Sequence, residues 1–291
     1  MKQILRYWLN HPLASKRLGR TVALFVWWQI ISRVKSVVRV KFATKSKLVV
    51  QRGMTGATGN IYCGLHEFQD MGWLMHTLRE DDLFLDIGAN VGSYTVLAAS
   101  EVGAEFHAFE PIPSTFEHLK ANIEENKVAD NGRLWNNGLG DQRSTLRFTN
   151  HLDTVNHVAA ESEDGIEVEV LTLDEIAFAI KKRLVKIDVE GYEQFVLDGG
   201  QAFFTETQAI LGIIIELNGS GNRFGKSDLD IHQQLLSWGY TSYAYDPMKR
   251  RLEPVIAPLD HNTIYIPDIT LLDVEQRIAS APKRNIHGVI F

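Results

Sequence analysis

The sequence contains one cysteine in 291 residues, Cys63, so the chain cannot form an internal disulfide. A single free thiol is typical of proteins from a reducing compartment, and we therefore expect a cytoplasmic protein. Cysteines and histidines do not cluster with the spacing of a zinc site, and we expect no metal. The composition, 45% hydrophobic and 23% charged, argues against a largely disordered or low-complexity chain.

Acidic residues are absent from the first 52 residues, although that segment contains twelve lysines and arginines. The first acidic residue is Glu67, and the remainder of the chain holds all 36 acidic residues with the other 18 of the 30 basic ones. Two regions of opposite charge therefore share one chain. Such a basic segment can contact anionic lipid, nucleic acid, or the acidic remainder of its own protein.

A run of apolar residues long enough to span a bilayer is missing from the basic segment. Its apolar stretch, residues 21–31, has about half of the roughly 20 residues required. The charged leader before it is too long for a signal peptide, and no small-residue cleavage site follows. We expect a helix over about 20–33. It either lies peripherally on the inner face of a membrane, with Trp27 and Trp28 at headgroup depth, or packs on the main domain or across a homodimer interface.

The rest of the sequence indicates one large domain. Residues 1–65 are expected to form the basic extension, with short β-segments near 48–51 and 61–63. Hydrophobic residues at 3- and 4-residue spacing predict a helix over 66–79. We assign the main domain to 66–270 and a C-terminal tail to 271–291.

Strands and helices alternate from residue 83 onward, which predicts a parallel α/β domain. The apolar run at 209–217 is typical of a central strand that is buried on both faces. The other expected strands are 83–87, 105–109, 133–137, 184–188, 240–245 and 262–266, with a hairpin-like excursion at 144–149 and 166–170.

A glycine-containing loop follows the first of these strands, with the pattern Asp86-x-Gly88-x-Asn90-x-Gly92. Glycines at this position let the backbone approach a ligand, and open α/β sheets bind nucleotides at the end of such a strand. The second strand ends in Glu110, whose carboxylate suits the hydroxyls of a ribose. The unit therefore predicts a nucleotide-type cofactor site.

The alternative cofactor is a dinucleotide such as NAD, which would make the protein an oxidoreductase. A pyrophosphate loop requires G-x-G-x-x-G, whereas three residues separate Gly88 from Gly92 here, and Asn90 lies between them. Asp86 would repel a pyrophosphate, yet its carboxylate suits the ammonium group of S-adenosylmethionine (SAM), which has no phosphate. The loop favours SAM.

The motifs resemble those of the FkbM family of class I SAM-dependent methyltransferases. The resemblance rests on residues 84–95, 107–111 and 184–193, with weaker blocks at 171–175 and 213–217, and covers about 66–245. It implies a Rossmann-like α/β fold: a seven-stranded, mostly parallel sheet with one antiparallel strand and helices on both faces. It also implies O-methylation of hydroxyls on sugars, lipid-linked glycans or secondary metabolites, with S-adenosylhomocysteine as the product.

Candidate site residues follow from these patterns and from the family motifs. We expect the cofactor to be bound by Asp86, Gly88, Asn90, Gly92, Tyr94, Glu110 and Asn136. The candidates for proton transfer to or from the acceptor are Asp188, Glu190 and His157, because an alcohol nucleophile benefits from a general base. The candidates for substrate binding are Lys186, Glu193 and Glu216. The alternative to these roles is a buried Lys186–Asp188 ion pair with the other carboxylates stabilising helix starts.

Two other functions stay open from the sequence. One is a SAM-dependent RNA methyltransferase that uses the basic segment for phosphate contacts. The strongly acidic main domain argues against it, and we expect no nucleic acid partner. The other is the NAD-type oxidoreductase, which the loop spacing disfavours.

Overall fold

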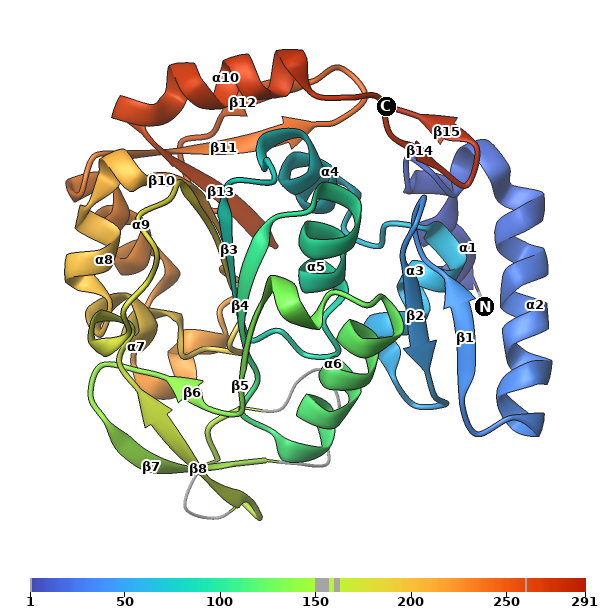
Figure 1. Cartoon of the computed structure of the whole chain (residues 1–291), viewed down its shortest axis with the longest axis horizontal. Helices are drawn as coiled ribbons and strands as arrows, with labels where there is room; N and C mark the ends of the chain where they lie inside the picture. Colours follow the sequence, from blue (N-terminus) through green and yellow to red (C-terminus); the bar gives the residue numbers. More distant parts are fainter. Residues whose placement is uncertain (1, 150–156, 160–162, 260) are drawn as a thin grey trace.

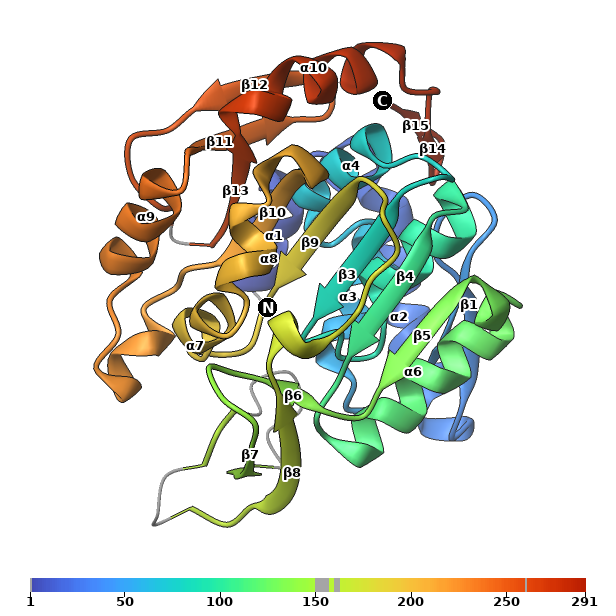
Figure 2. The same ribbon diagram turned by 60° about the vertical axis from the view of Figure 1, so that its left-hand side comes forward.

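A computed structural model of the chain describes residues 2–149, 157–159, 163–259 and 261–291. Its centre is a sheet with the strand order β12-β11-β13-β10-β9-β3-β4-β5, and helices cover both faces (Figures 1 and 2). The strands are β3 (Leu83–Ile87), β4 (Glu105–Phe109), β5 (Gly132–Trp135), β9 (Arg183–Ile187), β10 (Ile210–Glu216), β11 (Tyr240–Asp246), β12 (Arg251–Pro254) and β13 (Asn262–Pro267).

The pairing confirms the predicted fold class. Strands β5, β4, β3, β9 and β10 run parallel to one another, whereas β13 runs antiparallel to both β10 and β11. The sheet is thus mostly parallel, as expected, but it has eight strands rather than the predicted seven. Strand β12, which the sequence analysis did not predict, adds an eighth strand at the edge beside β11.

Two hydrophobic layers hold the sheet between the helices. Every residue of β3 and β9 is buried, as are six of the seven in β10, which agrees with the apolar residues that predominate in all three strands. One layer packs α4 (Phe68–Thr77), α5 (Ser93–Val96), its continuation Leu97–Val102, α6 (Pro113–Glu125) and α10 (Leu271–Ser280). The opposite layer packs α7 (Glu193–Asp198), α8 (Gln201–Thr205) and α9 (Asp228–Ser237).

A small second sheet lies beside the carboxyl ends of the main strands (Figure 2). Its order is β6-β8-β7, formed by Gly138–Leu139, Ile166–Leu171 and Ser144–Phe148. The antiparallel β7–β8 pair confirms the hairpin-like excursion expected from its alternating residues. Single 3-10 turns connect the larger elements at Ser15–Arg17, Ala129–Asn131, Leu173–Glu175, Thr207–Ala209, Ser220–Phe224 and Asp268–Thr270.

The N-terminal extension forms helices α1 (Lys2–Asn10), α2 (Leu18–Val34) and α3 (Thr55–Cys63), and strands β1 (Val38–Lys41) and β2 (Lys47–Val50). The prediction of a strand at 61–63 was wrong, because these residues belong to α3. Ala57 and Ile61 lie four residues apart and are both buried, which is helical spacing. Helix α2 agrees with the expected helix over about 20–33.

The extension packs on the main domain rather than standing apart from it. Trp28 is buried in the main hydrophobic core, His11 Nε2 contacts the carbonyl oxygen of His66 at 3.2 Å, and Arg39 pairs with Glu125 of α6 at 2.7 Å. After α10, the chain ends in a hairpin of β14 (Asn285–Ile286) and β15 (Val289–Ile290), which lies beside the extension in Figure 1. Among the described residues, no helix is both long and apolar enough to cross a membrane.

Candidate active site

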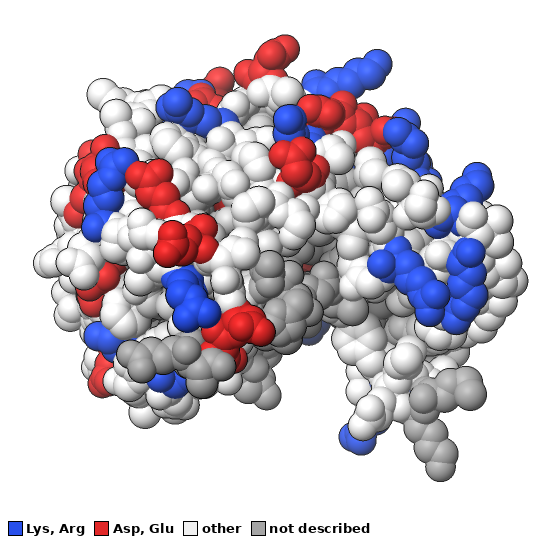
Figure 3. All heavy atoms as spheres, turned by 90° about the horizontal axis from the view of Figure 1, so that it is seen from below, with Lys and Arg blue, Asp and Glu red and all other residues white. Residues whose placement is uncertain are grey.

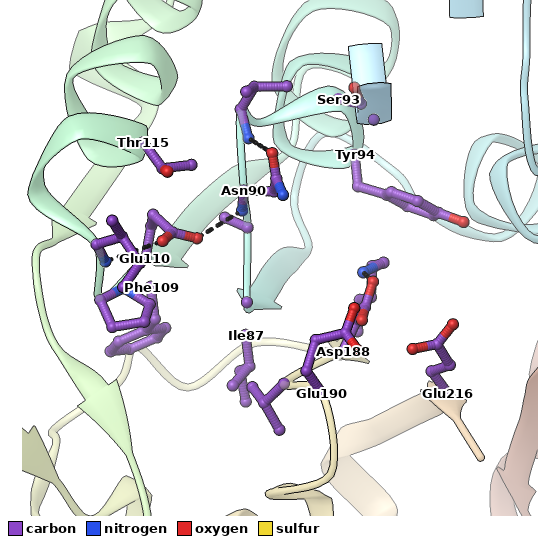
Figure 4. A pocket seen from close by; sticks show the side chains of 18 of the residues that line it. Ile87, Asn90, Ser93, Tyr94, Phe109, Glu110, Thr115, Asp188, Glu190 and Glu216 are labelled. Carbon is purple, nitrogen blue, oxygen red and sulfur yellow. Dashed lines mark hydrogen bonds and ion pairs between the residues drawn. The ribbon is translucent and has the colours of Figure 1, made fainter. Parts of the chain in front are cut away.

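A cavity of about 450 Å³ opens at the carboxyl ends of β3, β4, β9 and β10. Figure 4 shows its two sides: Glu110 and Asn90 lie on one, and Asp188, Glu190 and Glu216 on the other. Parallel strands bring their carboxyl ends to the same edge, where open α/β sheets bind ligands.

The loop after β3 requires its glycines for two separate reasons. Gly88 has a φ of +80°, and a Cβ there would lie 1.8 Å from the carbonyl oxygen of Asp188. Gly92 has a φ of +83°, and its Cβ would lie 2.5 Å from Leu119 of α6. Asn90 also adopts a positive φ, 51°, in which its Oδ1 accepts a bond from the Val91 N–H. The loop therefore packs closely against the backbone of Asp188, just after β9, and against Leu119 of α6.

Glu110 joins this loop to the end of β4. Its Oε2 accepts a hydrogen bond from Asn90 N–H and its Oε1 one from Ile112 N–H, each at 2.9 Å (Figure 4). Burial raises the pKa of Glu110 to about 7, and these two backbone bonds oppose the rise. The carboxylate lines the cavity, as the sequence predicted.

Asp86 lies beneath the loop and is not among the residues that line the cavity. Its Oδ2 accepts hydrogen bonds from the N–H and the hydroxyl of Thr95, at 3.0 and 2.5 Å, so it fixes the start of α5. Its Oδ1 is buried without a hydrogen-bond partner. Burial raises the pKa of Asp86, and the charge of Lys186 opposes that rise. Its contact with a cofactor stays a prediction.

The structure brings Asn137 to the cavity rather than Asn136. The Asn136 side chain donates to the carbonyl oxygens of Glu110 and Pro111, at 2.9 and 3.1 Å, and so stabilises the turn after β4. The predicted adenine contact of Asn136 therefore lacks support from its position.

Three carboxylates meet on the other side of the cavity. Asp188 follows β9, Glu190 lies in the next turn, and Glu216 ends β10. One carboxylate oxygen of each lies within 4.8 Å of the other two. Lys186, 3% exposed, points to the same place and contacts Asp188 Oδ2 at 2.7 Å. The sequence prediction that these side chains share one site is consistent with this geometry.

The close approach of like charges changes the pKa values of this cluster. Burial, followed by the charges of Asp188 and Glu193, raises the pKa of Glu190 to about 7. Burial, followed by the charges of Asp188 and Glu190, raises the pKa of Glu216 to about 9. Burial alone would lower the pKa of Lys186, but the surrounding carboxylates outweigh it and raise the pKa. Lys186 is therefore a permanent cation.

Glu193 is turned away from the cavity and holds the backbone that carries Glu190. Its Oε1 accepts hydrogen bonds from the N–H groups of Gly191 and Val189, at 3.0 and 3.2 Å. Glu190 adopts a φ of 53° in this turn, and a Cβ on Gly191 would lie 2.6 Å from the carbonyl oxygen of Ser220. Its contact with a substrate stays a prediction.

His157 does not line the cavity either. Its backbone N–H donates to the Thr149 hydroxyl at 3.0 Å, and its Nε2 lies 3.4 Å from Glu163. The residues before it, 150–156, lie outside the described part of the chain. Its role as a base stays a prediction.

Three residues that the sequence analysis did not assign, Glu67, Asp70 and Asn262, form a hydrogen-bonded group beside these carboxylates. Glu67, just before α4, lines the cavity. Asn262 at the start of β13 donates to Glu67 at 2.9 Å and to Asp70 at 3.2 Å. Burial, and then the charge of Glu67, raises the pKa of Asp70 to about 8. A usable signal was present, because Glu67 and Asp70 are the first acidic residues of the chain and lie together at the start of the buried helix α4.

Tyr94 of α5 lines the cavity on the side of the carboxylates (Figure 4). Lys186 Nζ lies 5.0 Å from the centre of its ring, and its hydroxyl is buried without a hydrogen-bond partner. Burial, then the charges of Glu67 and Asp70, raise the pKa of Tyr94 well above its usual value, so the hydroxyl stays a neutral donor.

A family model described as "Methyltransferase FkbM domain" matches residues 86–242. The hexuronic acid methyltransferase AglP of Haloferax volcanii is 27% identical over 149 residues, which cover 50% of this chain and 59% of that protein. The 31-O-demethyl-FK506 methyltransferase FkbM of Streptomyces tacrolimicus is 37% identical over 89 residues, 30% of this chain and 34% of that protein. Each match thus spans less than two thirds of the relative.

Among solved structures, the precorrin-6y C5,15-methyltransferase of Geobacter metallireducens is similar with a TM-score of 0.38 and 15% identity, over 69% of this chain and 86% of that chain.

Proposed function

The chain belongs to the FkbM methyltransferase family, whose methyl donor is S-adenosylmethionine, and from this premise we propose that it methylates a hydroxyl oxygen of a neutral acceptor. The acceptor class is a sugar, a glycan, a lipid-linked glycan or a secondary metabolite. The observation that carries the proposal is the division of one cavity into a glycine loop with Glu110 on one side and a carboxylate cluster with Lys186 on the other.

The glycine-loop side fits SAM. Gly88 and Gly92 leave the backbone bare where a ligand must approach, and Glu110 lies at the end of the neighbouring strand, where a ribose diol is bound in such sheets. One buried polar atom beneath this loop, Asp86 Oδ1, has no hydrogen-bond partner within the protein and suits a donor group on a ligand. When bound, the sulfonium supplies an activated methyl group.

The carboxylate side fits an acceptor hydroxyl. Methyl transfer is an in-line displacement, so the main task of the protein is to hold the acceptor oxygen in line with the methyl group. Asp188 is fixed by Lys186 and can accept a hydrogen bond from that hydroxyl. Glu190 has a pKa near 7, which suits a group that takes up a proton at neutral pH.

The charge of the cavity favours a neutral acceptor over an acidic one. Glu67, Asp188, Glu190 and Glu216 line the acceptor side, and Lys186 is the one Lys or Arg among the described residues of the lining. A carboxylate on the acceptor would meet this negative wall at short range, where like charges repel strongly. One relative is named for a hexuronic acid and the other for an acceptor with a free oxygen at position 31. The second acceptor type suits this cavity better.

Calorimetry followed by a transfer assay tests the proposal. The purified chain is expected to bind SAM and S-adenosylhomocysteine but not NAD. Label from methyl-labelled SAM is then measured on three matched panels: neutral sugars and macrolides, the corresponding uronic acids, and RNA. Transfer to neutral hydroxyls supports the proposal. Transfer confined to carboxylates or to RNA would overturn the acceptor class, and NAD binding in place of SAM would overturn the chemistry.

We also propose peripheral contact of the N-terminal extension with an anionic membrane. The outer face of α2 exposes a stripe of apolar side chains at four-residue spacing, Val22, Val26, Ile30 and Val34, with Trp27 beside it. Lys and Arg predominate on the right-hand part of Figure 3, which is the part formed by the N-terminal extension. An exposed apolar face bordered by basic residues is the composition of an interfacial helix.

Flotation with vesicles that contain phosphatidylglycerol is the test of this contact. Charge-reversal of Arg20 and Arg33 to Glu, together with Val26→Asp and Ile30→Asp, is expected to abolish flotation, whereas charge-reversal of the exposed Lys120 on α6 should not. Flotation that survives the α2 changes would refute the contact. A dimer that is lost with the same changes would assign this face to a homodimer interface instead.

A further inference from the structure

The carboxylate cluster holds more negative charge than its protein partners neutralise. Asp188, Glu190 and Glu216 each present one oxygen within 4.8 Å of the other two, and all three are half-buried. Lys186 contacts one of them, Asp188, at Oδ2. Like charges this close repel one another, so the folded chain needs a further positive charge here, either a proton or a cation.

The hydroxyl of Tyr94 is a second and independent sign that a ligand belongs in this place. The side chain is 4% exposed, and its hydroxyl has no partner at hydrogen-bonding geometry within the protein, although the Glu67 carboxylate lies near it. In Figure 4 the ring extends over the carboxylates, and its hydroxyl end lies on the side of Glu216. A buried donor without a partner is costly unless a ligand or its water satisfies it.

We propose that Asp188, Glu190 and Glu216 bind one divalent cation of the Mg²⁺ or Mn²⁺ type at the acceptor side of the cavity. The proposal rests on the proposed function in one respect, because it assigns the cation the task of holding the acceptor hydroxyl. The sequence analysis expected no metal. That expectation came from Cys and His spacing, whereas these ligands are three carboxylates from the ends of two neighbouring strands.

The chemistry of the ligands selects the cation. All three donors are carboxylate oxygens, which suit Mg²⁺ and Mn²⁺, whereas soft metals prefer thiolate or imidazole. Mg²⁺ is usually bound by a few carboxylates and keeps open positions for water or substrate oxygens. Three ligands at one rim of a cavity leave such positions facing the acceptor.

A cation here would serve the transfer in two ways. It would place the hydroxyl of a vicinal diol or similar group, and it would lower the pKa of that hydroxyl. In the balanced step, the acceptor O–H bond breaks, its proton passes to the second oxygen of Glu190 or to water, the new O–CH₃ bond forms, and the S–CH₃ bond breaks. No redox change occurs. The cation also removes the repulsion that otherwise opposes the ionised cluster.

Binding of Mn²⁺ alone to the full chain tests the site without donor or acceptor. Free Mn²⁺ is measured by electron paramagnetic resonance at pH 8, where more of the cluster is ionised. We expect one Mn²⁺ per chain, displaced by excess Mg²⁺. Glu216→Gln and Asp188→Asn should each weaken binding by about tenfold or more, because even loss of an outer-shell partner of a metal costs 10–100-fold. Glu125→Gln, a surface carboxylate paired with Arg39, is the matched control and should bind as the unchanged chain does.

Thermal unfolding gives a second measurement that does not depend on activity. Mn²⁺ should raise the Tm of the unchanged chain, because it binds only the folded state, and should not raise that of Glu216→Gln. Absence of stoichiometric Mn²⁺ binding, or equal binding by all variants, would overturn the proposal. SAM binding is measured on the same samples. If SAM binds and Mn²⁺ does not, only the cation site fails, and the reverse result would refute the proposed function alone.

Discussion

Asp86 of β3 and Lys186 of β9 are direct partners in the parallel strand pair, so the two sides of the cavity are joined through buried side chains. Asp86 fixes the start of the helix that follows the glycine loop, and Lys186 fixes Asp188 at the acceptor side. One register between two strands therefore sets the position of the donor loop relative to the acceptor carboxylates.

Replacement of the shared cation tests this link. Lys186→Met should lower the free energy of unfolding by roughly 2–4 kcal/mol, because it leaves buried Asp86 and half-buried Asp188 without their positive partner. Chemical denaturation measures the loss. Adding Asp188→Asn to Lys186→Met should restore part of the stability, since the second change removes an unpaired charge. If the loss of unfolding free energy in the double variant equalled the sum of the losses in the two single variants, Lys186 and Asp188 would not be coupled.

The stability of the chain should depend on pH through Glu216. Its pKa is raised to about 9 in the folded chain, while the unfolded value is near 4.5, so the folded state favours the protonated form. Its contribution is fully present below about pH 4.5 and is lost as the pH rises through 9. Glu216→Gln should therefore be more stable than the unchanged chain at pH 8–9, with no difference near pH 4.5.

Melting temperatures measured without metal between pH 4.5 and 9 check this trend. Glu125→Gln provides a control of opposite sign, because Arg39 lowers the pKa of Glu125 and its removal should cost a little stability above pH 5. If Glu216→Gln melted below the unchanged chain at pH 9, the repulsion within the cluster would be absent.

Substitutions of Glu110 and of Asp86 should both weaken SAM binding, but they should differ in their effect on the stability of the chain. Glu110→Gln keeps the shape of the side chain but can satisfy only one of the two backbone N–H groups, and it weakens the partner of a ribose diol. We expect SAM binding to weaken by about 1–3 kcal/mol, the range for a hydrogen bond to a charged group. Calorimetry measures the loss. S-adenosylhomocysteine should lose the same amount, because the ribose is common to both.

Asp86→Ala is expected to weaken SAM by a similar 1–3 kcal/mol, but with a different accompanying effect. Because Asp86 also holds Thr95 at the start of α5, its loss should lower Tm, and Asp86→Asn should recover part of that loss. Unchanged SAM affinity in a folded Asp86→Ala variant would show that this carboxylate acts on the loop alone.

The parts of the site that the sequence predicted are those that follow from strand ends. Glu110 and Asp188 come directly after buried strands, and such residues meet at one edge of a parallel sheet whatever the details of packing. Gly88 and Gly92 were predictable for a similar reason, because a ligand loop at that point needs bare backbone. The apolar sequences of β3, β9 and β10 fixed the sheet in the same way.

The parts that were missed depend on contacts that spacing does not encode. Asn262 reaches Glu67 across 195 positions in the chain, and only the antiparallel return of β13 beside β10 brings them together. Glu193 and Asn136 were expected at the cavity, but backbone groups capture their side chains. Glu193 accepts from the N–H groups of Gly191 and Val189, and Asn136 donates to the carbonyl oxygens that follow β4. Polar side chains near a turn often bond to the adjacent backbone in this way.

The rate of methyl transfer should depend on the ionisation of Glu190. Its pKa is about 7, raised by burial and by the charges of Asp188 and Glu193, and only the deprotonated carboxylate can take up a proton or bind a cation. The rate under saturating donor should therefore rise with pH between about 6 and 8 and then level off.

Glu190→Gln should remove this rise and lower kcat by roughly 10²–10⁴-fold if the carboxylate is the base. Glu190→Asp should retain the rise at a reduced rate, because the carboxylate is kept but withdrawn from the acceptor. A Glu190→Gln variant whose profile still rises through pH 7 would assign the titration to another group in the cavity, for which Glu110, with its own pKa near 7, is the next variant to measure.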